Sequence, residues 1–399
     1  QLASPVARLS SVNRFLHARN LETAESRGTV RPNVDTLYST SVFDLSQHDF
    51  NTTVPYIPNG HFVLFSYYDV YGNNFANTGT GNMNTPGSYL LRRTPRNSAY
   101  GVDTAHNTPA NSPYQAFINS PTAYGIFLVR WAVFNDSSLD SIYNWQAGTL
   151  IAAITRDPEY QTQPTLQQIE RRPFSGSDPE KILKLLAAFA PNNPPPIPSE
   201  LSFVDANLKA AGLFNGTYDQ VPGVDLNLAN TAALASITSS LSPNANILTN
   251  LGNGWSMLSP SLTDSFKSNY ALRAAVAAPG YLMLKAPNAL YPFWSNATSS
   301  SDDNASSPLG GAQEYLGAVE TVVYTFSRKP SLVEGAFWSL TAYEDNCLIP
   351  NGIGVYALGD RSNLTYADGK HVYGFSGGDD GQGGGMGAGS FRSWCSRRT

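Results

Sequence analysis

The sequence predicts an α+β fold, with two β-rich modules of sandwich or barrel-like form joined by a helical middle segment. Two blocks of alternating apolar and polar residues, one toward each end of the chain, predict the sheets. A stretch with apolar residues three and four positions apart separates the two blocks and predicts helices. The expected boundaries are 1–160 for the first module, 161–280 for the helical region, 281–376 for the second module and 377–399 for a disordered glycine-rich tail.

Composition limits the classes of partner. The chain has 399 residues, of which 41% are hydrophobic and 14% charged, so it can bury a core and is not a highly charged disordered chain. Its net charge is −5 and it has no run of Lys or Arg, which argues against binding to nucleic acid or to an anionic lipid surface. The longest apolar run, Tyr124–Phe134, is interrupted by Arg130 and is too short to span a membrane. We therefore expect a small-molecule or glycan ligand, and homo-oligomer formation stays open.

In the first module the apolar pattern predicts one helix and three strands. Leu9, Val12, Phe15 and Leu16 fall on one side of a helix over Val6–Ala24. Alternation predicts strands at His61–Tyr71, Ser88–Arg93 and Tyr124–Phe134. The first of these strands places its residues on two faces: Phe62, Leu64, Tyr68 and Val70 on one, and Val63, Phe65, Tyr67, Asp69 and Tyr71 on the other.

Helices and then short strands follow. Helical spacing predicts helices at Ser138–Ile154, Asp178–Ala190, Glu200–Leu213 and Thr263–Ala278. Asp178 and Pro179 suit the start of the second helix, and the proline-rich segment Pro191–Pro198 predicts a stiff extended linker after it. The second module is expected to contain strands at Val319–Ser327, Gly335–Glu344, Gly354–Gly359 and His371–Phe375.

Several features together favour a secreted glycoprotein. The sequence begins at Gln1 without a Met, as a mature chain does after removal of a signal peptide. Its low charge and its abundance of Asn, Ser, Thr and Tyr fit an extracellular surface. Six N-x-S/T sequons are candidate glycosylation sites: Asn51, Asn135, Asn215, Asn296, Asn304 and Asn363. The two cysteines, Cys347 and Cys395, form either one bridge or two free thiols.

Two segments of the first module carry groups suited to binding and proton transfer. The segment 31–39 contains Arg31, Asp35 and Tyr38, a cation, a carboxylate and a phenol that could hold an acidic or hydroxylated ligand. Asp35 could equally cap a turn and pair with Arg31. In the strand at 61–71 and just after it, a second group combines phenols, a carboxylate and amides: Tyr67, Asp69, Tyr71, Asn73 and Asn74. A Tyr acts as a base only if nearby cations lower its pKa, and Arg31 is the candidate cation if the segments meet. A partly solvated aromatic sheet face is the other interpretation.

The second module supplies a similar set. Tyr343 and Arg361 are candidate substrate-binding residues there. Glu344 and Asp345 are adjacent in a predicted strand, so they point to opposite faces and do not form the carboxylate pair of a glycosidase.

Other chemistries lack their sequence signals. The chain has no G-x-S-x-G motif, and its five histidines are scattered without the spacing of a metal site. The glycine-rich tail has no following helix, so it is not a dinucleotide-binding loop. We therefore predict no cofactor and no metal ligand.

Both motif sets resemble a known family pair. The segments Arg31–Ser39, Phe43–Ser46, Tyr67–Asp69 and Asn73–Ala76 resemble the module called domain of unknown function 1254. The segments Phe337–Thr341, Pro350–Asn351 and Gly359–Arg361, with Tyr343, are similar to its usual partner, domain of unknown function 1214. Asn253–Trp255 and Tyr270–Arg273 fit the region between them. The resemblance implies two β-rich modules linked by helices in an exported, fungal-type protein, and it implies no settled reaction.

These features support two functional hypotheses. The first is a secreted acid/base enzyme, a lyase or hydrolase, acting on a hydroxylated or uronic-acid-like small molecule or glycan. In it Arg31 and Asn73 would hold the anion, Tyr67 or Tyr71 would move the proton and Asp69 would orient them. The second is a non-catalytic protein that binds a carbohydrate or a small acid, or interacts with a surface, through the same residues.

Overall fold

The computed structural model describes residues 12–95, 98–104, 112–156, 163–241, 246–263, 265–266, 268–294, 323–325, 331–344, 346–359, 362 and 390–392. These residues form several β-sheets and six α-helices, which confirms the predicted α+β class. None of the sheets in this described part closes into a barrel. No described helix is both long enough and apolar enough to cross a membrane.

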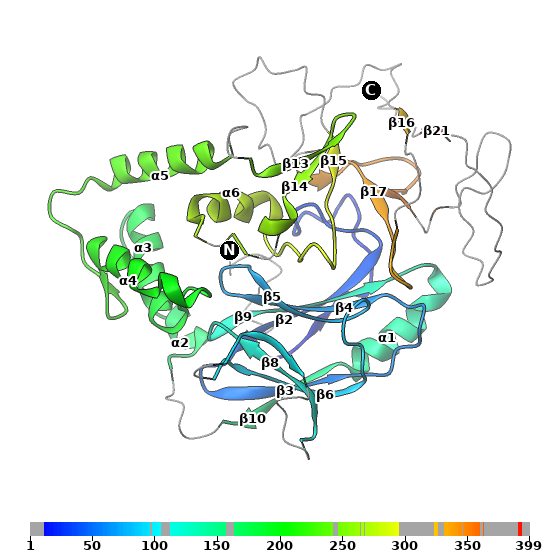
Figure 1. Ribbon diagram of the computed structural model, residues 1–399, viewed down its shortest axis with the longest axis horizontal. Helices are drawn as coiled ribbons and strands as arrows, with labels where there is room; N and C mark the ends of the chain where they lie inside the picture. Colours follow the sequence, from blue (N-terminus) through cyan, green and yellow to red (C-terminus); the bar gives the residue numbers. More distant parts are fainter. Residues whose placement is uncertain are drawn as a thin grey trace.

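Two five-stranded sheets pack face to face between residues 16 and 155 (Figure 1). Sheet A has the order β1-β2-β9-β4-β5, and its strands are β1 (Leu16–His17), β2 (Thr36–Asp44), β9 (Tyr124–Ala132), β4 (Val63–Asp69) and β5 (Asn74–Gly79). Sheet B has the order β10-β3-β6-β8-β7, and its strands are β10 (Leu150–Thr155), β3 (His48–Val54), β6 (Gly87–Arg93), β8 (Tyr114–Ser120) and β7 (Gly101–Thr104). Every pairing is antiparallel except that of β6 with β8.

The core lies between these two sheets. Both sheets contribute aromatic and aliphatic side chains to it, such as Phe65 and Val129 from sheet A and Tyr89 and Ile118 from sheet B. Tyr67 and Phe127 stack at the centre, with ring centroids 4.1 Å apart. The outer face of sheet A is buried as well, under the segment 281–289. Every residue of β4 is therefore buried, on both faces.

Helices lie at both ends of this sandwich and above sheet A (Figure 1). They are α1 (Leu139–Gly148), α2 (Leu166–Glu170), α3 (Asp178–Phe189), α4 (Leu201–Ala210), α5 (Leu226–Ser240) and α6 (Tyr270–Gly280). Figure 1 shows α6 above the β5 side of sheet A, with α3 and α4 to one side. α3 begins at Asp178 as predicted, but its N-cap is Ser177, in a capping box with Glu180, and not Asp178, which lies in the first turn with Pro179.

The remaining strands are short pairs. In the helical half these are β11 (Leu213–Phe214) with β12 (Thr217–Tyr218), and the ribbon β13 (Leu248–Gly252), β14 (Trp255–Leu258) and β15 (Phe293–Trp294). In the last third they are β16 (Val323–Thr325) with β21 (Ser390–Arg392), β17 (Ser339–Thr341) with β20 (Ala357–Gly359), and β18 (Tyr343–Glu344) with β19 (Cys347–Leu348). The strand expected at 371–375 lies outside the described residues, as does the tail expected at 377–399 apart from β21.

Two predicted helices are wrong over part of their length. The described part of 6–24 contains no helix: Leu16–His17 form β1, which pairs with β2, and His17 Nδ1 lies 2.8 Å from Ser39 Oγ. The helix expected at 138–154 ends at Gly148, and residues from Leu150 onward form β10 along the edge strand β3. Two further predictions need adjustment: α6 begins at Tyr270 rather than 263, and the segment 191–198 contains a 3₁₀ turn at Ala190–Asn192 rather than being extended throughout.

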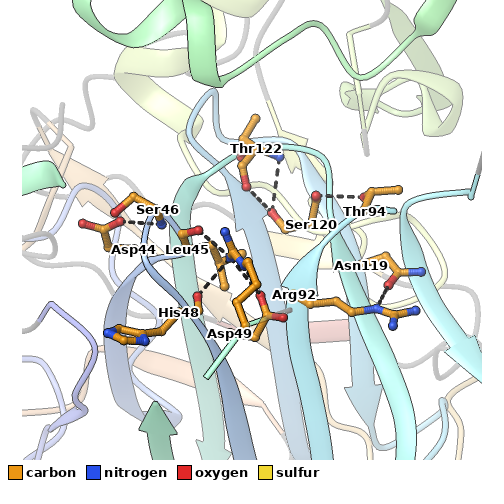
Figure 2. Close-up of polar contacts among 11 residues, drawn as sticks. Asp44, Leu45, Ser46, His48, Asp49, Arg92, Thr94, Asn119, Ser120 and Thr122 are labelled. Atoms are coloured by element: carbon orange, nitrogen blue, oxygen red, sulfur yellow. Dashed lines mark hydrogen bonds and ion pairs between the residues drawn. The ribbon is translucent and has the colours of Figure 1, made fainter. Parts of the chain in front are cut away.

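A polar cluster at one edge of the sandwich stabilises this fold (Figure 2). The Arg156 guanidinium forms an ion pair with Asp49 at 2.8 Å and donates to the carbonyl oxygens of Leu45 and His48. Nearby, Ser120 Oγ donates to the Thr122 carbonyl and accepts from the Thr122 amide. The polar groups of this cluster bond to backbone groups or to one another. The cluster therefore holds the connections between strands in place and is not a candidate binding site.

Candidate functional site

The structure divides the predicted site residues into two groups at opposite ends of sheet A. Thr36 on β2 is paired with Ala132 on β9, whereas Asp69 on β4 is paired with Gly125 on the same strand. Seven residues of strand separate these positions, which is about 20 Å. Arg31 and Asp35 therefore do not meet Asp69 and Tyr71, and the cation predicted beside the phenols is not Arg31.

Tyr67 lies in the core and not in an open site. Its ring packs between Phe75 and Phe127 on the inner face of sheet A, and its side chain is fully buried. Burial raises the pKa of the Tyr67 hydroxyl, opposed by the neighbouring Thr52 and Thr78 hydroxyls. No described residue forms a hydrogen bond of ordinary geometry with that hydroxyl. This position gives the ring a packing role.

Tyr67→Phe is accordingly expected to change the free energy of unfolding by less than about 1 kcal/mol, because the lost hydroxyl makes no good hydrogen bond. Urea denaturation of the variant measures the change. Tyr124→Phe serves as the matched control, since the buried Tyr124 hydroxyl donates to the Pro164 carbonyl, and it should lose about 1 kcal/mol. A larger loss for Tyr67→Phe than for the control would contradict the placement.

Asp69 organises the turn that follows β4. Its Oδ1 accepts the backbone N–H groups of Tyr71 and Asn73, both at 2.9 Å, and its Oδ2 accepts Asn73 Nδ2 at 2.7 Å. The carboxylate is fully buried, and this desolvation raises the pKa of Asp69, while the hydrogen bonds from Asn73 and the charge of Arg273 oppose the rise. The turn thereby places Tyr71 and Gly72 at the edge of sheet A.

A pocket lies beside this turn. It is lined by residues of the turn, of α6 and of the segments before and after α6: Tyr71, Gly72, Thr263, Phe266, Arg273, Val276, Ala277, Tyr281, Leu282 and Met283. The Arg273 guanidinium carbon lies 5.8 Å from the centre of the Tyr71 ring and 5.5 Å from that of Tyr270. The free space holds a group little larger than a water molecule. We call this the Tyr71 pocket.

The phenols of the pocket are kept protonated. Burial raises the pKa of Tyr71, the charge of Asp69 raises it further, and Arg273 opposes both. Burial and Asp69 likewise raise the pKa of Tyr281. The Tyr71 hydroxyl donates to the Asn193 carbonyl, whereas the Tyr281 hydroxyl makes no hydrogen bond to another described residue. Tyr281 is thus the phenol best placed to donate a hydrogen bond to a ligand.

The other predicted group gathers where the segment 31–38 meets β18. The Tyr343 hydroxyl on β18 donates to the Pro32 carbonyl at 2.9 Å, and the Arg31 amide donates to the Asn346 carbonyl at 2.9 Å. Burial raises the pKa of Tyr343 to about 12, with Tyr38, Arg31 and Asp35 close enough to affect it. The structure thus brings four predicted substrate-binding residues together. Arg361, the other candidate from the second motif set, lies outside the described residues.

Asn74 belongs to a buried amide network instead. Its Nδ2 donates to the Tyr67 carbonyl at 3.1 Å, and its Oδ1 accepts Asn77 Nδ2 at 2.6 Å. Asn77 in turn bonds Asn288, which ties β5 to the segment after α6. This network positions the cover of sheet A and is not exposed to a ligand.

The described sequons differ in accessibility. Asn135 and Asn215 are exposed, whereas Asn51 is half-buried within β3 with its Oδ1 enclosed. Asn296, Asn304 and Asn363 lie outside the described residues.

Cys347 is a free thiol in β19, and Cys395 is also outside the described part. Within that part, no three His, Cys, Asp or Glu side chains gather as they would around a metal ion.

Two arginines at these sites were not predicted as site residues. Arg130 is the charge that interrupts the apolar run of β9, and Arg273 is the lone charge in the alanine-rich helix α6. A single Arg inside an otherwise apolar element is the signal that could have identified both, because a buried guanidinium needs acceptors.

Comparison with known proteins supports the fold and part of the expected family. No curated protein matches the sequence. The crystal structure of the VPA0106 protein from Vibrio parahaemolyticus superposes with a TM-score of 0.53 at 15% identity, covering 85% of this chain and 76% of that one, which shows a shared fold alone. An uncharacterized protein from Burkholderia cenocepacia reaches a TM-score of 0.20 at 11% identity, over 38% of this chain and 36% of that one, too low to indicate a common fold. Residues 12–153, which include the sandwich except for the last two residues of β10, match the family model described as "Protein of unknown function (DUF1254)".

Proposed function

We propose that the protein binds a hydroxylated or uronic-acid-like small molecule or glycan end at the Tyr71 pocket and acts on it by acid/base chemistry, as a lyase or hydrolase. The observation that supports this most directly is the meeting of Arg273 with Tyr71 and Tyr281 around one pocket, with the Asp69 carboxylate buried behind it. Arg273 takes the anion-holding role that the sequence suggested for Arg31.

Each group has a chemical role in this proposal. The Arg273 guanidinium binds the carboxylate of the ligand, whose attached sugar or chain stays outside the small pocket. Tyr281, kept protonated by burial, donates a proton to a leaving oxygen. Asp69, whose pKa burial raises, acts electrostatically on both Tyr71 and Tyr281 and is the carboxylate that would accept a proton.

The broader setting is proposed on sequence grounds. The DUF1254-like module would be followed by a DUF1214-like one, carried by the motifs at 337–361, and the chain would be a secreted fungal-type glycoprotein. Glycans on the exposed Asn135 and Asn215 are the simplest check, because mass spectrometry of the secreted protein reports them directly.

Steady-state kinetics with oligogalacturonides and other uronides tests the enzymatic role. Tyr281→Phe should lower kcat by about 10²- to 10⁴-fold with little change in KM, since it removes a proton donor and keeps the ring. Arg273→Gln should mainly raise KM, and Arg273→Lys should restore part of the affinity. The exposed Tyr56→Phe is the control and should leave both constants unchanged. Full activity in Tyr281→Phe would rule out its role as proton donor.

A second function, binding without turnover, is favoured by the geometry of the pocket. Its free space is small and the Tyr71 hydroxyl already donates to a backbone carbonyl, so no deprotonated phenol is available as a base. Calorimetry with D-galacturonate separates the two functions. Saturable binding that Arg273→Gln abolishes, with no product from any uronide at any pH, would favour the binding role.

A further inference from the structure

Arg130 lies at the centre of the outer face of sheet A, away from the Tyr71 pocket. On the strand β9 it is paired with Tyr38 of β2 and with Leu64 of β4. Its neighbours on that face are apolar, including Ile126, Leu128 and Leu284. A guanidinium among such side chains is costly unless acceptors or an anion compensate its lost hydration.

The protein itself supplies little of that compensation. Arg130 Nη1 donates one long hydrogen bond, of 3.3 Å, to the Tyr68 hydroxyl, and its guanidinium carbon lies 6.0 Å from the centre of the Tyr38 ring. Tyr291 is a third phenol close enough to interact electrostatically with it. No carboxylate in the described part of the chain forms an ion pair with Arg130. A guanidinium has five N–H donors, so most of its capacity remains for a ligand or solvent.

The surroundings suit a planar anion. Tyr291 is the most exposed residue of this cluster, at 45%, whereas Tyr38 and Arg130 are half-buried and Tyr68 is fully buried. Burial raises the pKa of Tyr68 and raises that of Tyr291 to about 12, so both hydroxyls remain protonated and can donate hydrogen bonds. Tyr38 also lies close to Tyr343, whose hydroxyl is affected by the charge of Arg31.

We propose that Arg130, Tyr38, Tyr68 and Tyr291 form a second ligand site, specific for a small carboxylate. The guanidinium pairs with the two carboxylate oxygens in its own plane, and the phenols donate to the same oxygens or stack on the ligand. The site is distinct from the Tyr71 pocket, because Arg130 pairs with Leu64 and the turn beyond Asp69 is five strand residues further, or about 16 Å. It does not depend on the acid/base function proposed above.

Relaxation of the ¹⁹F signal of 4-fluorobenzoate, titrated with the full-length protein, tests this site. We expect saturable binding that acetate displaces, with an affinity at least 10-fold lower in Arg130→Gln and partly restored in Arg130→Lys. Arg171→Gln, which replaces an exposed arginine outside both sites, should bind the probe as the wild type does. Unchanged affinity in Arg130→Gln would overturn the proposal, and a loss of affinity confined to Arg273→Gln would assign the probe to the Tyr71 pocket instead.

Two further experiments test the carboxylate specificity and the role of Tyr291. Inorganic phosphate should compete less well than acetate, and stronger competition by phosphate would overturn the carboxylate specificity. If Arg130→Gln does not fold, Tyr291→Phe and Tyr291→Ala decide, since Tyr291 is half-exposed and its replacement leaves the core intact. A fall of affinity in Tyr291→Ala, with a smaller fall in Tyr291→Phe, supports the site, and no change in either variant overturns it.

Discussion

Asp69→Ala is expected to lower the free energy of unfolding by about 3 kcal/mol, because it leaves three donors without their acceptor in a buried turn. The donors are the backbone N–H groups of Tyr71 and Asn73 and the side-chain amide of Asn73, which is itself buried. Some of the loss is offset, since the variant no longer buries a charge. Urea denaturation near neutral pH measures the change.

Asp69→Asn is the matched control. Its carbonyl oxygen can still accept the two backbone N–H groups, and its amide can donate to Asn73 if that side chain turns to present its Oδ1. Asn73 Oδ1 has no hydrogen bond to a described residue in the wild type, so rotating this side chain costs little free energy. We expect a loss below about 1 kcal/mol. Equal losses in both variants would show that the charge, and not the acceptor, stabilises the turn.

The pH dependence of stability, compared between the wild type and Asp69→Asn, reports on the charge of Asp69. Burial raises its pKa in the folded state above that of the unfolded chain, so the folded state binds the proton more tightly. Stability from this group is then fully present below the unfolded pKa, about 3.9, and is lost as the pH rises through the folded pKa. The wild type should therefore gain stability relative to Asp69→Asn as the pH falls. The opposite slope would mean that the pKa is lowered.

The placement of Asp69 and Tyr67 illustrates what alternation along a strand can predict. The alternation at 61–71 correctly predicted a strand, β4, because side chains of opposite faces pack in different environments. It could not predict which face reaches a ligand, since β4 is buried on both faces, between sheet B and the segment after α6. Tyr67 was therefore grouped with Tyr71 as a proton-transfer residue, although only Tyr71 lines a pocket.

Tertiary pairing explains the remaining differences. Arg273 approaches Tyr71 across about 200 residues of chain, and no local pattern encodes that meeting. Ile151 and Ile154 are spaced for a helix, but the edge of β3 was available to pair with them, and the strand formed. By contrast, Arg31 and Tyr38 come from one motif set and Tyr343 from the other. The sequence identified all three as candidates but could not predict that they lie close together.

Gly125→Ala is expected to destabilise the sandwich by about 3 kcal/mol or more, because no space exists for a methyl group at this position of the strand β9. A Cβ at this position would lie 2.2 Å from the Tyr68 carbonyl oxygen and 2.2 Å from the Phe43 ring. Gly125 is paired with Phe43 on β2 and with Asp69 on β4, so any relief would displace two ladders at once. Thermal and urea denaturation would measure the loss.

Two further variants identify the cause of that loss. Gly352→Ala adds the same methyl group at an exposed position with no neighbouring atom within 4 Å, and it should change stability by less than about 0.5 kcal/mol. Phe43→Leu combined with Gly125→Ala removes the ring clash but leaves the carbonyl clash, so it should recover little stability. A full recovery would show that the ring, which can rotate, is the only obstacle, and that the strands β4 and β9 can separate slightly without loss of the Asp69 turn.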